Sequence, residues 1–265
     1  MSARSWVTQL QGLQHALRMI ALDLPGHGES DPAPGAASIE EYAAVAAEVL
    51  GALARGPVIV VGHSLGGSVA IALAARRPDL VRGLVLIASC VKLPLVDSIG
   101  ERLVAYLPGP LRRLLFFSMA KKVLFAPGAP IDAVAIAMQE LRACRPDTIL
   151  NDVRVARAMD LTEQAAALDV PTLVLAGSRD RLTTPALAER LSALIRSSRL
   201  RIVDGAGHML PLEAPEQVNR EIVTFIESLG APLSVPAADA RKRPFVRVLD
   251  RLSRLVRRRR GSPPN

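Results

Sequence analysis

The sequence predicts an α/β fold, in which a mostly parallel sheet is flanked by helices and interrupted by an inserted helical segment. Short apolar runs alternate along the chain with helical patterns of apolar residues, which is typical of strands joined by helical crossovers. The 265 residues are 50% hydrophobic and 22% charged, which excludes wholesale disorder. A chain of this length can bury a sizeable core, and aliphatic side chains must fill it because only 3% of residues are aromatic.

The first third of the chain predicts two helices around a short strand and a loop. Residues 5–17 carry apolar residues at helical spacing, and residues 18–22 (RMIAL) form a short apolar run that predicts a strand. A loop rich in Gly, Pro and Asp follows. Ser38 has the position of a helix cap, with Glu41 three residues on as its capping-box partner, and this helix is expected to end near Ala54.

The next elements alternate more regularly. Residues 57–61 (PVIVV) are continuously apolar, which favours a strand buried on both faces of a parallel sheet. A helix is expected over 65–76 and another buried strand over 84–88. After an interruption the alternation resumes with two strands and two helices, at 171–176, 185–195, 200–203 and 216–229.

The interruption, residues 92–166, consists of amphipathic helical pieces broken by prolines, and we interpret it as an inserted helical subdomain. Three of the five phenylalanines lie there, Phe116, Phe117 and Phe125. The chain is therefore divided into a first part of the core, the helical insert, a second part of the core and a basic tail: 1–91, 92–166, 167–230 and 231–265.

The net charge of +8 is concentrated at the end of the chain. Residues 231–265 hold ten Lys and Arg and two Asp, so the rest of the chain is neutral. Apolar residues at helical spacing within 243–260, with arginines opposite, predict a helix that lies on an anionic membrane surface. A solvated extension and a helix docked on its own body are the alternatives. The neutral body and the scarcity of aromatic residues in the tail argue against binding to nucleic acid.

Composition also bears on location and on cofactors. No secretory signal opens the chain, so we expect a cytoplasmic protein, peripheral at the membrane through its tail. Residues 57–75 lack charged residues, but glycines and serines interrupt them, and we interpret them as strand, turn and helix rather than as a membrane span. Cys90 and Cys144 lack the spacing of a disulfide scaffold or a metal site, and we expect neither metal nor cofactor.

The motif GHSLGG (62–67) is the strongest chemical signal. The pattern Gly-x-Ser-x-Gly between a strand and a helix holds a serine in a strained turn, which only very small residues two positions either side allow. The turn lifts the hydroxyl clear of the sheet at a helix N-terminus, where the Leu65 N–H can face a developing oxyanion. We interpret Ser64 as a nucleophile; the alternative is a glycine-rich turn with an idle serine.

A serine nucleophile needs a general base. His208 lies just past the last predicted strand, where loops at the carboxyl ends of parallel strands assemble sites. His15 lies in the first helix, His27 in the early loop and His63 beside the serine, and all three are poorly placed for the role. The alternative for His208 is a loop histidine packed against the core.

The base in turn needs an orienting carboxylate. Asp180 follows the strand 171–176 and leaves the same edge of the sheet as Ser64 and His208. Asp204 is a nearby competitor that could be a turn residue, and Asp97 is a weaker one. The chain order Ser, Asp, His is the order expected for a nucleophile-elbow hydrolase.

At this point the sequence resembles the α/β-hydrolase family. The resemblance covers roughly residues 4–229 and rests on four motifs in the family's order: DLPGHGESD (23–31), GHSLGG (62–67), GSRD (177–180) and GAGHMLPLEAPEQV (205–218). It implies Ser64 as nucleophile, His208 as base and Asp180 as orienting acid. It also implies that residues 92–166 form a cap over the substrate pocket.

The chain departs from the family at its start. Members usually begin with two or three more strands and a His-Gly loop that supplies the second oxyanion N–H. Residues 2–6 (SARSW) resemble the start of the helix after that loop, so the N-terminal strands and the second donor are expected to be missing from this chain. Losing one such donor lowers turnover by about 10²–10³-fold. A start placed upstream is the preferred explanation; a degenerate fragment and re-paired strands are the alternatives.

These motifs predict a serine hydrolase that cleaves small-molecule carboxylic esters through an acyl-enzyme. The phenylalanines Phe116, Phe117 and Phe125 indicate an apolar or lipid-like acyl group, although core packing is the commoner use of such residues. A carbon–carbon bond hydrolase and a cofactor-free haloperoxidase are alternatives on the same fold. The rival from another class is a truncated, non-catalytic relative whose tail binds a membrane or a partner.

Overall fold

The computed structural model describes residues 2–32, 38–94 and 109–230. Within these ranges four parallel strands form one sheet in chain order: β1 (Val58–His63), β2 (Val81–Ile87), β3 (Thr172–Gly177) and β4 (Ser198–Val203). The strands also end together, because His63 pairs with Ile87 and Gly177 with Val203. The predicted parallel sheet is confirmed, and the loops that leave its carboxyl edge are neighbours.

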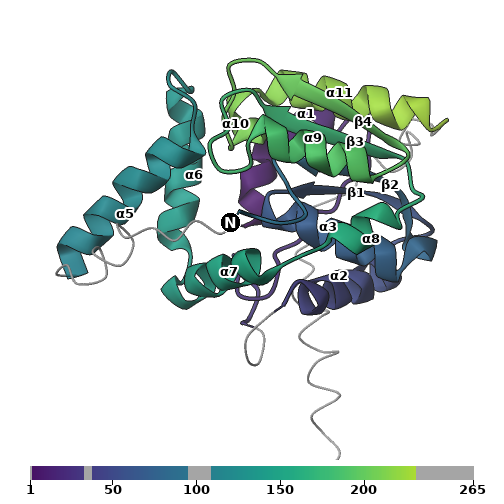
Figure 1. The fold of residues 1–265 in the computed structure, drawn as a ribbon, viewed down its shortest axis with the longest axis horizontal. Coiled ribbons are helices and arrows are strands. Elements are labelled where there is room, and N and C mark those ends of the chain that lie inside the picture. The colour runs from purple at the N-terminus through teal and green to yellow at the C-terminus, as the bar shows by residue number, and fades with distance from the viewer. Residues whose placement is uncertain (1, 33–37, 95–108, 231–265) are drawn as a thin grey trace, which may run out of the picture.

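Helices cover both faces of this sheet (Figure 1). On one face lie α2 (Ile39–Leu53), α3 (Leu65–Arg76) and α9 (Pro185–Leu194), and on the other lie α1 (Val7–Leu13) and α11 (Pro215–Ser228). Four short helical elements complete the flanking layers: η1 (Ala3–Trp6), η2 (Pro78–Leu80), α8 (Thr162–Ala166) and α10 (Leu210–Glu213).

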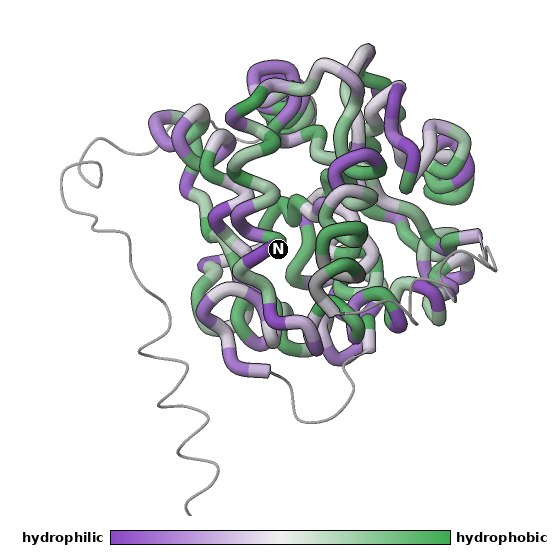
Figure 2. The backbone as a smooth tube through the Cα atoms, turned by 90° about the vertical axis from the view of Figure 1, so that its left-hand side faces the viewer, coloured by the Kyte–Doolittle hydropathy of each residue, from purple (hydrophilic) through white to green (hydrophobic). Residues whose placement is uncertain are grey.

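The alternation of side chains along β2 explains why both faces need cover. Leu84 and Leu86 belong to the core cluster under α2 and α3, whereas Val85 and Ile87 belong to the cluster under α11. All four side chains are fully buried, as a strand between two helical layers requires. In Figure 2 hydrophobic stretches of the chain run through the middle of the body, and many of the hydrophilic ones lie toward its outside.

The capping box predicted for the second helix is confirmed. Ser38 Oγ accepts from the Glu41 N–H at 3.2 Å, and the Glu41 carboxylate accepts from the Ser38 N–H at 2.8 Å. Both bonds satisfy N–H groups that have no partner inside the helix. The start of α2 therefore follows from local sequence.

Between β2 and β3 the described chain forms three longer helices, α5 (Gly109–Leu124), α6 (Ile131–Ala143) and α7 (Pro146–Ala158). Pro130 stands immediately before α6, and Pro146 is the first residue of α7, a position at which proline costs no hydrogen bond. In Figure 1 α5 and α6 extend away from the sheet. These helices are called the insert below.

The first strand of the sheet differs from its expectation. Residues 58–61 of β1 are only partly buried, whereas every residue of β3 is buried. Among the described strands β1 pairs with β2 alone, so it is an edge strand of the described sheet, although Val60 packs on one core cluster and Ile59 and Val61 pack on the other. The strand expected at 18–22 is also absent, because a strand needs a neighbour for its backbone hydrogen bonds and no described strand lies beyond β1.

The uncharged stretch 57–75 forms β1, the turn at Ser64 and most of α3. Throughout the described part of the chain, no helix is long and apolar enough to cross a membrane. The basic tail and Asp97 lie outside the described residues.

Candidate active site

Ser64 stands at the turn between β1 and α3, in a backbone conformation that few residues adopt. Its φ is 54° and its ψ is −123°, which is strained for a residue with a side chain. The Ser64 N–H donates to the Ile87 carbonyl at 2.9 Å and so fixes the turn to the end of β2. The strained turn that the GHSLGG motif predicts is present, at the carboxyl edge of the sheet.

Two glycines make room for this turn, and one of them is not where the motif placed it. A Cβ on Gly62 would collide with the Gly66 carbonyl, and a Cβ on Gly67 would collide with the Ser89 side chain. A Cβ on Gly66 itself would meet no described atom within 4 Å. The expectation that Gly66 is needed for space was wrong, because the close approach comes one residue later, where α3 passes Ser89.

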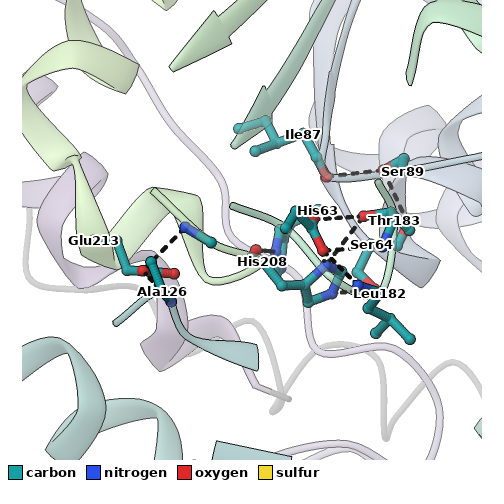
Figure 3. Close-up of polar contacts among 11 residues, drawn as sticks. His63, Ser64, Ile87, Ser89, Ala126, Leu182, Thr183, His208 and Glu213 are labelled. Carbon is teal, nitrogen blue, oxygen red and sulfur yellow. Dashed lines mark hydrogen bonds and ion pairs between the residues drawn. The ribbon is translucent and has the colours of Figure 1, made fainter. Parts of the chain in front are cut away.

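His208 lies in the loop after β4, and only 2% of its surface is exposed. Its Nε2 is 3.0 Å from Ser64 Oγ, and its Nδ1 is 2.9 Å from Asp180 Oδ2. Figure 3 shows the His208 and Ser64 side chains pointing toward each other. A neutral ring that carries its proton on Nδ1 donates to the carboxylate and leaves Nε2 free to accept the serine proton. The structure therefore brings the predicted serine, histidine and acid into one hydrogen-bonded chain.

Asp180 is buried and holds four hydrogen bonds. Oδ1 accepts from the N–H groups of Leu182 and Thr183 at 2.8 and 2.9 Å, and Oδ2 accepts from Thr183 Oγ1 at 2.7 Å and from His208. Burial acts to raise the pKa of Asp180, but the histidine and these donors outweigh burial, so the net shift of the pKa is downward. Asp180 therefore stays ionised opposite the imidazole.

The other candidates for the base and the acid lie outside this hydrogen-bonded chain. Asp204 Oδ1 accepts from Ser178 Oγ at 2.9 Å, the role of a turn residue. His15 is exposed. His27 is hydrogen-bonded to Asp152, on the insert. His63 Nε2 donates to the His208 carbonyl at 2.8 Å, so it contacts the backbone of the base rather than the serine.

The Leu65 N–H belongs to the first residue of α3, where helix geometry leaves it without a partner inside the helix. This position beside Ser64 fits the expected oxyanion donor. The three phenylalanines of the predicted pocket are scattered. Phe125 is buried in a cluster with Met209 and others, Phe117 is half-buried under the Arg142 guanidinium at 5.6 Å, and Phe116 is 39% exposed. Their role in a pocket stays a prediction.

The sequence analysis missed two residues that hold the site together. Thr183 Oγ1 lies between Asp180 and His208, 3.1 Å from His208 Nδ1. Its position three residues after an aspartate, before a helix, was the available signal. Ser89 Oγ lies 3.0 Å from the Ser64 carbonyl and 2.9 Å from the Ile87 carbonyl. No local pattern marks Ser89, because the Ser64 carbonyl that it contacts follows the end of another strand.

The described residues contain no group of three or more His, Cys, Asp or Glu side chains placed to hold a metal ion. Both cysteines are free thiols, and burial raises the pKa of Cys90 to about 11, which keeps it protonated and a poor nucleophile. The Ser64 hydroxyl, by contrast, lies 3.0 Å from the Nε2 of His208.

A parallel sheet between helices, with a serine, a histidine and a carboxylate in contact at its carboxyl edge, defines a class of hydrolytic enzyme. The chain belongs to the alpha/beta hydrolase family, which matches residues 1–221, and the protein is an esterase-type hydrolase of that family. The fold class and family expected from the sequence are confirmed.

Known relatives carry related activities. A pimeloyl-[acyl-carrier protein] methyl ester esterase of Neisseria meningitidis is 33% identical over 223 residues, covering 79% of this chain and 83% of that protein. A non-heme haloperoxidase of Rhodococcus erythropolis is 29% identical, covering 86% of this chain and 89% of that protein. A thermophilic esterase from Thermogutta terrifontis superposes with a TM-score of 0.75 at 26% identity, covering 86% of each chain.

Proposed function

We propose that the protein hydrolyses carboxylic esters of small molecules by a Ser64–His208–Asp180 triad. The observation that carries this proposal is the unbroken hydrogen-bonded chain from Ser64 Oγ to His208 Nε2, and from His208 Nδ1 to Asp180 Oδ2, at 3.0 and 2.9 Å. No other described histidine joins a serine hydroxyl to a carboxylate in this way.

The reaction follows from the donors and acceptors of this chain. His208 Nε2 takes the Ser64 proton as Oγ attacks the acyl carbonyl carbon, and the new oxyanion faces the Leu65 N–H. The tetrahedral intermediate expels the alcohol, which receives the proton from His208. Water then attacks the acyl-enzyme, giving its proton to His208, and the acid leaves as Ser64 regains its hydrogen. Asp180 holds the ring with Nδ1 protonated and stabilises the imidazolium that forms twice per cycle.

An apolar acyl group fits the surroundings of the base. Met209, next to His208, belongs to a buried apolar cluster that includes Phe125 and Leu212, and the Met209 N–H donates to the Leu124 carbonyl at 3.0 Å. The insert therefore brings apolar side chains to the side of the histidine, as a cap over a pocket would. The methyl ester esterase among the relatives supports an ester substrate rather than an amide.

A fluorophosphonate probe tests the proposal, because it bonds covalently to an activated serine. The wild-type chain should be labelled, Ser64→Ala should not, and Ser197→Ala, which changes an exposed serine away from the site, should be labelled like wild type. Hydrolysis of p-nitrophenyl esters of increasing acyl length then reports the acyl preference. Folded wild-type protein that takes no label would favour the non-catalytic alternative.

The haloperoxidase relative supports a second candidate, peroxide-dependent halogenation by the same triad. A comparison of two activities distinguishes this candidate from ester hydrolysis. Unlabelled wild-type enzyme is assayed with p-nitrophenyl acetate, and separately with acetate, hydrogen peroxide and bromide. Higher turnover in the second assay would assign the site to peroxide chemistry. Contact of the tail with an anionic membrane stays a prediction.

A further inference from the structure

Glu213 ends α10, in the same loop region as His208, and no step of the proposed reaction uses it. Its Oε2 accepts two backbone hydrogen bonds, one from the Gly207 N–H and one from the Ala126 N–H, both 3.0 Å long (Figure 3). Gly207 directly precedes the histidine, and Ala126 lies in the segment between α5 and α6. One carboxylate oxygen thus joins the loop of the base to the insert.

Other bonds complete the attachment of this loop. The Met209 N–H donates to the Leu124 carbonyl at 3.0 Å, and His63 Nε2 donates to the His208 carbonyl at 2.8 Å. The peptide groups before and after the catalytic histidine are therefore both held. Met209 thus reaches Leu124 of the insert directly, Gly207 reaches Ala126 through the Glu213 carboxylate, and His63 joins His208 to the end of β1.

The two segments are in direct contact. A Cβ on Gly207 would lie 2.5 Å from the Ala126 nitrogen and 2.9 Å from the Phe125 carbonyl carbon, so only a glycine fits between the insert and the Glu213 carboxylate. The contact is short because both backbones share the same acceptor oxygen. A shift of Leu124–Ala126 would move Gly207, and the His208 ring with it.

The acceptor itself is unusual. The second oxygen, Glu213 Oε1, is buried and has no hydrogen-bond partner in the described structure. Burial raises the pKa of Glu213, and the backbone donors only partly oppose that shift. A carboxyl group that is half-satisfied in a partly buried place costs stability. A role in joining the insert to the His208 loop would explain why the Glu213 carboxyl group occupies this unfavourable place.

We propose that Glu213 is a positioning residue, which ties the backbone of the His208 loop to Leu124–Ala126 and so keeps His208 Nε2 within reach of Ser64 Oγ. This inference rests on the proposed function of Ser64 and His208. Placement matters because a displacement of about 1 Å in a catalytic group can lower a rate by about 10²-fold. Binding of a small ester depends much less on that distance.

The test compares Glu213→Ala with Glu213→Gln. Alanine removes the shared acceptor, whereas the glutamine carbonyl can still accept from both N–H groups. Glu216→Ala is the matched control, because Glu216 is an exposed glutamate at the start of α11. We measure kcat per active site, counted by fluorophosphonate labelling, and KM for p-nitrophenyl acetate. Glu213→Ala should lower kcat by about 10–100-fold with KM changed by less than about 3-fold, and Glu213→Gln and Glu216→Ala should stay close to wild type.

A merely structural role would lower the number of labelled sites and the melting temperature, but leave kcat per labelled site unchanged. That result, or an equal loss of kcat in the alanine and glutamine variants, would overturn the inference. If Glu213→Ala does not fold, Glu213→Asp is measured instead, because the shorter aspartate side chain cannot reach both N–H groups. An unchanged kcat of Glu213→Asp would equally overturn the inference. Wild-type protein without labelling would instead remove the proposed function.

Discussion

Two buried histidine–carboxylate pairs in the described structure invite comparison, because they look alike at first sight. His208 Nδ1 lies 2.9 Å from Asp180 Oδ2, and His27 Nε2 lies 2.8 Å from Asp152 Oδ2. Both imidazoles are 2–3% exposed. The pairs differ in what faces the second nitrogen of each ring, and that difference decides what each pair can do.

His208 faces a donor there, and His27 faces an acceptor. The Ser64 hydroxyl can donate to His208 Nε2, whereas the Pro25 carbonyl, 3.2 Å from His27 Nδ1, can only accept. A neutral imidazole has one N–H and one acceptor nitrogen, so it satisfies both partners of His208 but only one partner of His27. A histidine beside a carboxylate is therefore a base only where its other nitrogen is left free to accept a proton.

The His27–Asp152 pair has the contacts of a structural tie. Asp152 lies on α7 and also accepts from the Tyr42 hydroxyl at 3.1 Å, and burial together with this carboxylate raises the pKa of Tyr42 to about 12. Thr148, also on α7, donates to the Gly26 carbonyl at 3.0 Å. These bonds fasten the insert to α2 and to the loop around His27. The His27–Asp152 pair thus joins parts of the fold, whereas the His208–Asp180 pair has the contacts of the proposed triad.

Substituting each histidine gives the largest expected contrast. His208→Ala should lower kcat by about 10⁴–10⁶-fold, because the serine loses its base, and leave a folded protein. His27→Ala should keep kcat within about 10-fold but lower the free energy of unfolding by about 1–3 kcal/mol, because it leaves Asp152 short of a donor. Ester hydrolysis and urea unfolding measure the two effects. A loss of kcat in His27→Ala as large as in His208→Ala would show that the comparison is wrong.

Substituting the two carboxylates, Asp180 and Asp152, should give the same contrast with a smaller effect on kcat. Asp180→Asn should lower kcat by about 10⁴-fold, because an amide favours the wrong tautomer of His208. Asp152→Asn should leave kcat within about 3-fold and lower stability by about 1–3 kcal/mol. Steady-state kinetics and circular dichroism of both variants check this. Near-normal turnover of Asp180→Asn would move the orienting acid to another carboxylate.

A third histidine sharpens the comparison through pH. Burial, and then the neighbouring His208, lower the pKa of His63 from 6.5 to about 3. Between these two values the unfolded chain binds a proton that the folded chain does not, so stability falls as pH falls through this window, by up to about 1.4 kcal/mol per pH unit. His63→Gln keeps a donor for the His208 carbonyl but cannot titrate. Its unfolding free energy, measured from pH 6.5 to 4, should fall less steeply than that of wild type; equal slopes would assign the acid sensitivity to other groups.

Local sequence was informative where one segment contains all the interacting groups. The capping box of Ser38 and Glu41 closes within four residues, and the strained turn at Ser64 has its space from Gly62 and Gly67, both within three residues. The same reasoning placed Asp180 and His208 correctly at the edge of the sheet, because parallel strands that alternate with helices must end together. Short-range rules suffice for elements of this kind.

Contacts between distant segments of the chain could not be predicted from the sequence pattern. The apolar run 57–61 predicts a buried strand, yet residues 58–61 of β1 are only partly buried, and 18–22 forms no strand. Glu213 and Ser89 look like ordinary polar residues until their backbone partners, at Ala126 and at Ser64, come within reach. Hydrogen-bond partners that lie 87 and 25 residues away along the chain leave no periodic signal near the residue itself.

The sequence by itself determined the nucleophile turn, the order of strands and helices, and the edge at which the serine, acid and histidine emerge, since each depends on residues a few positions apart. Only the tertiary structure decided which histidine can accept a proton. That choice depends on whether a hydroxyl or a carbonyl faces the second ring nitrogen, and for His208 the facing atom follows the end of β1, on the opposite side of the described sheet from β4.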